Sequence, residues 1–334
     1  MGSANVTAPL AGMCRQHGLE VVVITEGLAS KTYEDAGFSP YFKGTANWRV
    51  EPFTLMPDAV LETVKPDAVV VGLGWPIHLE ETFALAANRC KIPLVMCADF
   101  WNCVRRNQAV PQLVLAIDEV DARLSSELHK SALVRIVGNP GVPAAPIAPA
   151  PEVAELRKSC ENVYTFIGGG VNTGKEIEFL VECLKLTTGR WRLIPRFHPK
   201  YAKLKPPGGS ETYNAIWREM LQPFEQWLAY IDGPRTDAIV VASDLTVSAL
   251  STLLATSAQA GKVAVSLDVP TMRDELDEIA GIQEFPLVTL GCAHRVREPV
   301  DLSTLAPMTA EHLAKLKPYD ARVAYQDLAA FLGV

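Results

Sequence analysis

Short apolar runs alternate with amphipathic stretches along most of the chain. The runs at 163–167 and 263–267 are five residues long and rich in β-branched side chains, which is typical of parallel strands covered on both faces. Residues 175–186, between these runs, carry their apolar side chains at helical spacing. Strands that alternate with helices in this way predict an α/β fold built on parallel sheets.

The same patterns predict the remaining elements of both halves of the chain. Strands are expected at 20–25, 67–74, 92–98, 113–117, 133–137, 191–195, 238–242 and 285–290. Helices are expected at 8–17, 75–90, 118–130, 215–231, 250–260, 310–315 and 319–332.

Residues 236–267 combine a predicted strand, a polar loop, a helix and a second strand. In an open α/β sheet the loop from strand to helix lines the ligand crevice, and helix N-terminal amides favour anions there. Ser248, Ser251 and Thr252 lie in this loop or at the helix start. Two interpretations stay open: these hydroxyls bind an anion, or Ser251 or Ser248 caps the helix.

The length of 334 residues predicts more than one domain, because single hydrophobic cores rarely extend that far. A Pro- and Ala-rich run at 143–153 has no usable period and is the predicted linker. The predicted α/β domains cover 1–142 and 154–318. A last helix over 319–334 could cross back to the first domain.

The N-terminal segment predicts only the second half of a strand–helix–strand unit. A helix at 8–17 leads through Gly18 to a strand at 20–25, but no strand is found before Gly2. A Rossmann-type sheet normally places that first strand near its centre. A misplaced start codon, a trimmed chain and a sheet that has lost a strand are all open explanations.

Composition and charge narrow the functional classes. Lys and Arg number 31 and Asp and Glu 38, giving a net charge of −7 without a basic tract, which argues against non-specific nucleic-acid binding. We expect no membrane span, because the apolar runs are only strand-sized, and no signal peptide. The seven scattered cysteines indicate a reducing cytoplasm, and neither disulfides nor a zinc site. The expected localisation is therefore cytoplasmic.

Polar and aromatic side chains follow the predicted strand at 92–98. Asp99, Trp101, Asn102 and Arg105 lie within seven positions of one another, and polar groups on strand-end loops are often functional. The alternative is a surface ion pair between Asp99 and Arg105, which contributes little to stability.

In the second half, two loops carry candidate phosphate-binding groups. The sequence GGGVNTGK at 168–175 joins a strand to a helix, so its backbone amides can approach a phosphate. It lacks the spacing of a P-loop, and such turns often need only permissive backbone dihedrals. Arg196, His198 and Lys200 follow the next strand and form a cation cluster suited to an anion or a diphosphate.

The chain contains no GxSxG, HExxH, CxxC or DxD motif that would indicate a different chemistry. The order of strand, GGG turn and helix, then strand and RFHPK, then SDLTVSALSTLLATSAQAGKVAVSL resembles the C-terminal half of GT-B-fold glycosyltransferases. It is also similar to the related UDP-N-acetylglucosamine 2-epimerases. Residues 118–142 resemble the exit from the first domain of the same group.

The resemblance implies two Rossmann-like domains facing a cleft, with the first strand of the N-terminal one missing here. It implies that the C-terminal domain holds a nucleotide-sugar diphosphate and that the N-terminal domain holds the acceptor. Metal is generally not needed, because helix dipoles and basic side chains balance the diphosphate charge. No cofactor is expected, and the nucleotide-sugar is a co-substrate.

Mapped onto this sequence, the resemblance implies a role for each candidate residue. Asp99 is the candidate general base, and His198 is the catalytic candidate beside the diphosphate. The donor-binding candidates are Gly169, Gly170, Asn172, Thr173, Arg196, Lys200, Ser248, Ser251 and Thr252. The acceptor-binding candidates are Trp75, Trp101, Asn102 and Arg105.

One departure from the family pattern concerns the ribose of the donor. The family commonly places a Glu five residues before the glycine at Gly261, where it holds the ribose hydroxyls, and this chain has Thr256. The expected function is a metal-independent glycosyltransferase that moves a sugar from a nucleotide-sugar to an acceptor hydroxyl. The alternatives are a sugar-nucleotide epimerase or hydrolase, and a non-catalytic binding module, which Thr256 and the missing strand favour.

Overall fold

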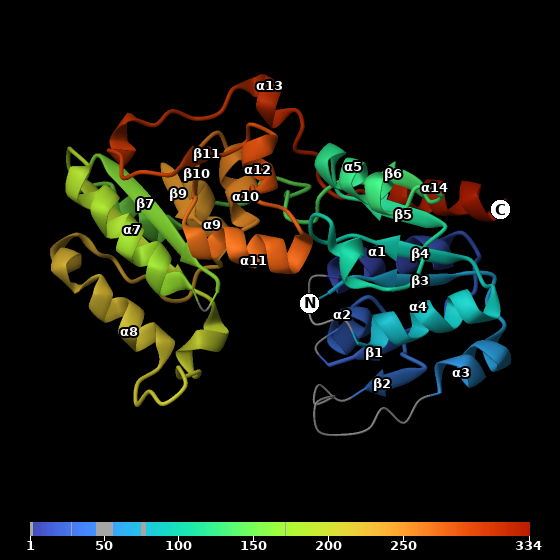
Figure 1. Cartoon of the computed structure of the whole chain (residues 1–334). Coiled ribbons are helices and arrows are strands. Elements are labelled where there is room, and N and C mark those ends of the chain that lie inside the picture. Colours follow the sequence, from blue (N-terminus) through green and yellow to red (C-terminus); the bar gives the residue numbers. More distant parts are fainter. Residues whose placement is uncertain (1–2, 28, 45–55, 75–77, 171) are drawn as a thin grey trace. The chain divides into compact units, whose positions relative to one another are not determined.

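The computed structural model describes residues 3–27, 29–44, 56–74, 78–170 and 172–334 (Figure 1). The chain divides into two compact units. The first unit contains Met1–Pro140, Ile279–Gly281 and Lys317–Val334. The second unit contains Gly141–Glu278 and Ile282–Leu316. The division at 140/141 lies just before the predicted linker at 143–153.

The first unit is built from short parallel strands and covering helices. Its helices are α1 (Ala4–Gln16), α2 (Ala29–Asp35), α3 (Pro57–Val64), α4 (Leu79–Cys90), the short 3₁₀ helix η1 (Cys103–Arg106), α5 (Glu119–Leu128) and α14 (Ala321–Leu332). Its strands are β1 (Ile24–Glu26), β2 (Phe42–Gly44), β3 (Val69–Gly72), β4 (Leu94–Cys97), β5 (Leu113–Ala116) and β6 (Leu133–Ile136).

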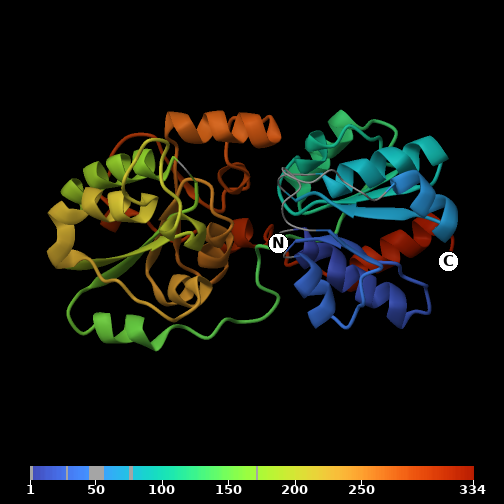
Figure 2. The same ribbon diagram turned by 90° about the horizontal axis from the view of Figure 1, so that it is seen from below.

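These strands form two separate parallel sheets among the described residues, β3-β4-β5-β6 and β1-β2. Helices α4 and α5 lie on one face of the larger sheet, and α1 and α14 lie together on the other (Figure 2). Val6 and Leu10 of α1 pack with Leu115 of β5 and Leu328 of α14 in one core. The C-terminal helix is thus part of the first unit, and the Tyr319 hydroxyl fixes it by donating to the Val6 carbonyl at 2.8 Å.

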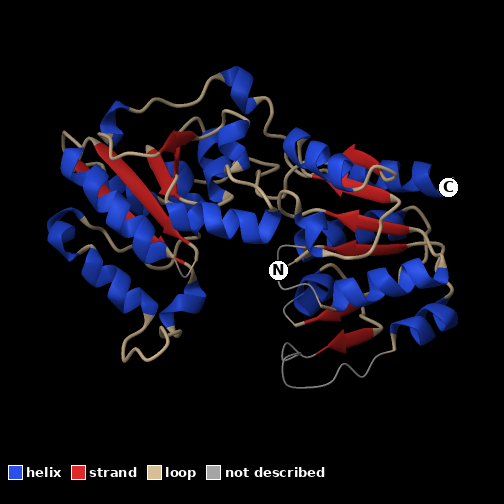
Figure 3. Ribbon diagram, in the orientation of Figure 1, coloured by secondary structure: helices blue, strands red, loops and turns tan. Residues whose placement is uncertain are grey.

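The second unit contains one five-stranded parallel sheet in the order β11-β10-β9-β7-β8 (Figure 3). Its strands are β7 (Asn162–Gly168), β8 (Trp191–Phe197), β9 (Leu245–Ser248), β10 (Val263–Leu267) and β11 (His294–Val296). Its helices are α6 (Pro151–Leu156), α7 (Thr173–Leu186), α8 (Tyr213–Met220), α9 (Thr236–Ala242), α10 (Leu253–Gln259), α11 (Pro270–Ala280, ending in the first unit), α12 (Pro286–Thr289) and α13 (Ala310–Leu313), with 3₁₀ turns η2 (Pro199–Ala202), η3 (Gln222–Trp227) and η4 (Leu302–Thr304).

Two predicted strands are wrong, and both are helices. Residues 238–242 lie in α9, and the strand is the following segment β9, which was expected to be a polar loop. A short apolar run without periodicity fits a buried helix as well as a strand. Residues 285–290 contain α12, where Pro286 occupies the first turn, a position that suits its fixed φ and missing N–H.

Other predictions differ at the boundaries. The first helix begins at Ala4, four positions before the expected start. The single helix expected at 215–231 is instead α8 followed by η3, with Pro223 near the break, because proline cannot donate a helical hydrogen bond. Within the described residues, no helix is both long enough and apolar enough to cross a bilayer.

Candidate functional site

In the second unit, the turn between β7 and α7 is shaped by three glycines. A Cβ on Gly168 would lie 2.4 Å from the Thr173 methyl group, so a side chain does not fit there. A Cβ on Gly169 would meet no atom within 4 Å, so the backbone of this residue borders open space. The Thr173 hydroxyl donates to the Gly170 carbonyl at 2.8 Å and closes the turn. The turn therefore presents exposed backbone beside the N-terminus of a 14-residue helix, an arrangement suited to an anion.

The loop after β8 lies directly beside this turn. The register pairs Gly168 with Phe197, and the His198 N–H donates to the Gly168 carbonyl at 3.0 Å. Burial and the charge of Lys200 both lower the pKa of His198, so its imidazole is neutral at pH 7. The Lys200 ammonium lies 4.8 Å from the centre of the Tyr201 ring and carries the positive charge next to the turn.

Arg196, in contrast, is engaged on a different segment. Its guanidinium donates to the carbonyls of Ile231 and Pro234 and to the Thr236 hydroxyl. These bonds anchor the loop that leads into α9. The predicted cations therefore have different roles. Arg196 holds a loop of the fold in place, and Lys200 is the cation beside the glycine turn.

The hydroxyl groups of the β9–α10 loop make internal hydrogen bonds. Ser248 is buried and donates to the Ile167 carbonyl at 2.8 Å, which joins β9 to β7. The Ser251 hydroxyl accepts the Leu253 N–H at 3.2 Å and caps the start of α10. Thr252 is at the N-cap position and makes no side-chain cap bond. For Ser251 the structure thus shows the capping alternative.

Two carboxyl groups close to the glycine turn were not singled out from the sequence. Glu176 is buried, accepts the Ala249 N–H at 3.4 Å, and has its pKa raised to about 8, mainly by burial. Glu275 accepts a hydrogen bond from the Asn172 side-chain amide at 3.5 Å, and burial raises its pKa as well. Glu176 could have been found, because it lies on the apolar face of α7 beside Ile177.

Thr256, which stands in place of the family's glutamate, is also buried. Its hydroxyl lies 3.2 Å from the Gly141 carbonyl and donates to it. The side chain therefore fastens the start of the second unit and does not offer a carboxylate for ribose hydroxyls.

In the first unit, Asp99 follows the carboxyl end of β4. Its Oδ1 atom is buried and has no hydrogen-bond partner among the described residues. Burial raises the pKa of Asp99 to about 6, although the Arg106 charge opposes the shift. Arg106 is held in place by donating to the carbonyls of Leu73 and Ile279, at 3.2 and 3.1 Å. The site therefore has a carboxyl group that can take up and release protons near neutral pH.

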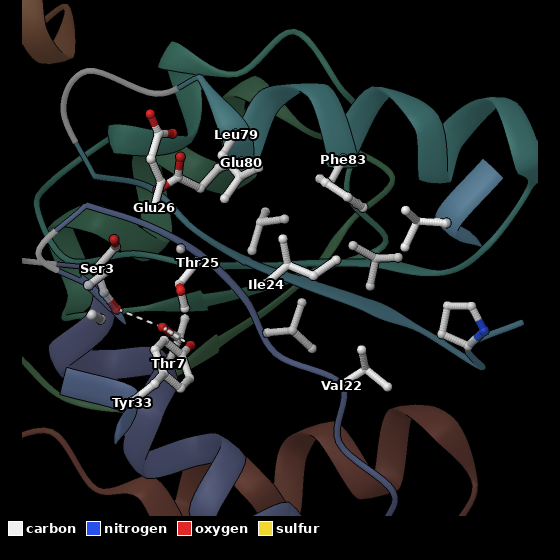
Figure 4. A pocket seen from close by; sticks show the side chains of 18 of the residues that line it. Ser3, Thr7, Val22, Ile24, Thr25, Glu26, Tyr33, Leu79, Glu80 and Phe83 are labelled. Carbon is white, nitrogen blue, oxygen red and sulfur yellow. Dashed lines mark hydrogen bonds between the residues drawn. The ribbon is translucent and has the colours of Figure 1, made fainter. Parts of the chain in front are cut away.

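Two further carboxyl groups of the first unit, Glu80 and Glu26, were not predicted from the sequence. The charge of Glu80 raises the pKa of Asp99. Glu26 ends β1, Glu80 is in the first turn of α4, and their side chains lie close together in Figure 4. Burial is the main cause that raises the pKa of each, and the Glu26 charge raises that of Glu80 further. Their positions in the sequence, at the end of a strand and at the start of a helix, could have identified them as candidate site residues. Among the described residues, no three His, Cys, Asp or Glu side chains are arranged to hold a metal ion.

The predicted acceptor-binding residues are mostly committed to the fold. Trp101 is fully buried and donates from Nε1 to Asp118 at 2.6 Å. Asn102 is buried at φ 50°, and its amide donates to the Ala280 carbonyl at 2.6 Å. Arg105 is exposed and lies against Gly281, where a Cβ would clash with the guanidinium. Trp75 lies outside the described residues.

Comparisons with known proteins give matches in structure. No protein-family model and no curated sequence matches the chain. The Staphylococcus aureus MnaA–UDP structure matches with a TM-score of 0.64 and 16% identity, covering 100% of this chain and 94% of that one. The UDP-GlcNAc 2-epimerase of Neisseria meningitidis bound to UDP-GlcNAc matches with a TM-score of 0.59 and 16% identity, over 98% of this chain and 96% of that one.

A third match is the MurG structure of Acinetobacter baumannii, with a TM-score of 0.57 and 14% identity over 98% of this chain and 96% of that one. The glycosyltransferase of kitacinnamycin also matches, at a TM-score of 0.51. Identities this low carry information about the fold alone. The parallel sheets of both units and these matches show that the chain has the GT-B-like fold.

Proposed function

We propose that the protein is an enzyme acting on a nucleoside diphosphate-sugar, and that it epimerises the sugar by proton transfer. The observation that carries the proposal is Asp99, whose buried Oδ1 atom has no hydrogen-bond partner among the described residues and whose pKa is about 6. A general acid or base is most effective when its pKa is near the operating pH. The solved structures with bound UDP and UDP-GlcNAc share the fold and support the choice of substrate class.

The second unit supplies a place for the diphosphate. The exposed Gly169 backbone, the N-terminus of α7 and the Lys200 ammonium favour negative charge. Glu176 would repel an anion if it were ionised, but its pKa of about 8 keeps it protonated at pH 7. A diphosphate at the turn would therefore meet no opposing charge from Glu176.

Epimerisation fits the first unit better than glycosyl transfer does. Inverting a sugar carbon by proton transfer needs one group that accepts a proton and another that donates one. The pKa of Asp99 is about 6, and burial raises the pKa values of Glu80 and Glu26 from their ordinary value. Carboxyl groups whose surroundings shift their pKa values can divide the roles of acid and base between them. Two residues expected to bind a sugar acceptor, Trp101 and Asn102, are buried and hydrogen-bonded within the fold. Glycosyl transfer, which the likeness to MurG suggests, is the second candidate.

Incubation with a panel of UDP-, GDP-, CMP- and dTDP-sugars in D₂O tests the proposal by NMR. An epimerase that works by proton transfer incorporates deuterium at the inverted carbon without any acceptor. Nucleotide release that requires an acceptor would instead show a glycosyltransferase. Thermal stabilisation without turnover would show a binding module.

Asp99→Asn supplies the matched variant for the same assay. We expect turnover to fall about 10²- to 10⁴-fold, the usual contribution of a general acid or base. Nucleotide affinity, measured by titration calorimetry, should stay unchanged. Asp274→Asn, at an exposed position of α11, serves as the control. Full activity of Asp99→Asn would exclude the assignment.

A further inference from the structure

A cavity of about 420 Å³ lies between β1 and β3 within the first unit (Figure 4). Residues 22–26 contribute to one wall and residues 68–72 form the other. Most of the lining side chains are apolar, and Leu79 and Phe83 close the cavity from the side of α4. Each wall is about five residues long, which corresponds to roughly 16 Å of extended chain.

Both walls are open strand edges among the described residues. β1 pairs with β2 on one side, and β3 pairs with β4 on one side. The Val69 N–H donates to the Pro93 carbonyl, and the Val23 carbonyl accepts the Tyr41 N–H. Because successive residues of a strand direct their polar groups to opposite sides, those of Val70 and Ile24 point into the cavity.

Exposed apolar side chains mark the same two edges. Val22 is 39% exposed and Val70 is 38% exposed, although parallel strands are normally buried on both faces. Open, apolar strand edges are templates for pairing with another strand. A strand placed here would pair on both sides and join the two sheets into one, in the order β2-β1-new strand-β3-β4-β5-β6.

The start of α1 identifies the end of the cavity at which this strand would stop. Ser3 lines the cavity, and its Cβ lies 2.5 Å from where a Cβ on Gly72 would be, at the carboxyl end of β3. Thr25, near the carboxyl end of β1, lies beside Ser3 in Figure 4. A strand parallel to both walls would therefore end next to Ser3 and continue directly into α1.

We propose that this cavity is a strand-binding site, filled by an extended apolar segment of about five residues that is joined to α1 from the N-terminal side of Ser3. The segment, α1 and β1 then form a complete strand–helix–strand unit, in which consecutive parallel strands are connected by a helix. β-branched side chains suit the segment, because it would be covered on both faces. Its last residue is small, because the space beside Gly72 is already filled by Ser3.

The test adds five apolar β-branched residues directly before Gly2 and measures thermal unfolding and amide hydrogen exchange. We expect a rise in Tm of at least about 5 °C and slower exchange at Val70 and Ile24. The matched control has the same extension with proline at its middle position, which cannot donate to the ladder. The control should show neither effect.

Three results would overturn the proposal. Equal effects of both extensions would show that strand pairing is not involved. Strong protection of Val70 and Ile24 in the unextended monomer would show that the cavity is closed in solution. Protection that appears only with dimer formation, followed by size-exclusion chromatography, would assign the site to a second copy of the chain.

Discussion

Asp99 combines two properties that suit a proton-transferring group, an oxygen without a partner among the described residues and a pKa near neutrality. Its Oδ1 atom is buried without a partner among the described residues, and burial outweighs the attraction of Arg106 in setting a pKa of about 6. If the ionised form is the active base, kcat/KM should rise with pH and level off above about pH 6. Measuring kcat/KM from pH 5 to 9 checks this limb. The limb should be absent from the residual activity of Asp99→Asn, and its persistence would point to Glu80 or Glu26 instead.

The pKa of Glu176 leads to a prediction about the pH dependence of stability. It is about 8 in the folded chain, far above the ordinary glutamate pKa of 4.5. Because the pKa of Glu176 is higher in the folded chain, the unfolded chain loses the Glu176 proton at a lower pH than the folded chain does. The contribution of Glu176 to stability is therefore complete below pH 4.5 and declines as the pH rises to about 8. A tenfold change in a protonation equilibrium corresponds to about 1.4 kcal/mol, so the total loss is on the order of a few kcal/mol.

Urea denaturation at pH 5 and pH 8 measures this slope. Glu176→Gln can still accept the Ala249 N–H, and we expect it to unfold with much less pH dependence over this range. Glu178→Gln, on the exposed face of the same helix, should behave as the wild type does. Equal slopes in all three proteins would contradict the burial argument.

At the scale of elements, the glycine turn between β7 and α7 gives a matched pair of substitutions. Gly168→Ala places a Cβ 2.4 Å from the Thr173 methyl group, whereas Gly169→Ala places one in open space. We expect Gly168→Ala to destabilise the chain by about 1–3 kcal/mol, as overpacking usually does, and to weaken UDP binding. Gly169→Ala should leave the free energy of unfolding within about 0.5 kcal/mol of the wild-type value. Equal destabilisation by both variants would show that the turn does not depend on this contact.

The elements also show what the sequence could predict. The run at 263–267 is β10 without a change of boundary, because a five-residue, largely apolar run between turn signals leaves few alternatives. Residues 238–242 look similar, yet they form α9, whose Ile239 and Val240 are buried in the core. The neighbouring β9 was missed because its Thr246 and Ser248 hydroxyls suggested a loop. In the structure Ser248 lies inside the sheet and bonds to Ile167.

At the scale of the whole molecule, the order of strands and helices was easier to predict than the hydrogen bonds and burial of individual side chains. The alternation of strands and helices was enough to place the glycine turn beside His198, since parallel strands end at one edge. It could not show that Arg196 is held by backbone carbonyls or that Trp101 is buried against Asp118. Those contacts depend on loops distant in sequence. The raised pKa values of Glu26, Glu80 and Glu176 depend in the same way on burial, which a local pattern does not report.

Ligand-induced stabilisation tests the assignment of the diphosphate for the intact chain. If the turn and Lys200 bind the diphosphate, UDP should raise Tm while uridine at the same concentration should not. A ligand at about 100 times its Kd stabilises a protein by about 2.7 kcal/mol, which is a shift of several degrees for a chain of this length. Lys200→Glu should abolish most of the shift, because it replaces the cation beside the turn with an anion. Lys203→Glu changes the net charge equally at another exposed position and should retain the shift. If both variants lose the UDP-induced rise in Tm equally, only the overall charge of the protein matters. If uridine raises Tm as much as UDP does, the base and ribose, and not the diphosphate at the glycine turn, account for the binding.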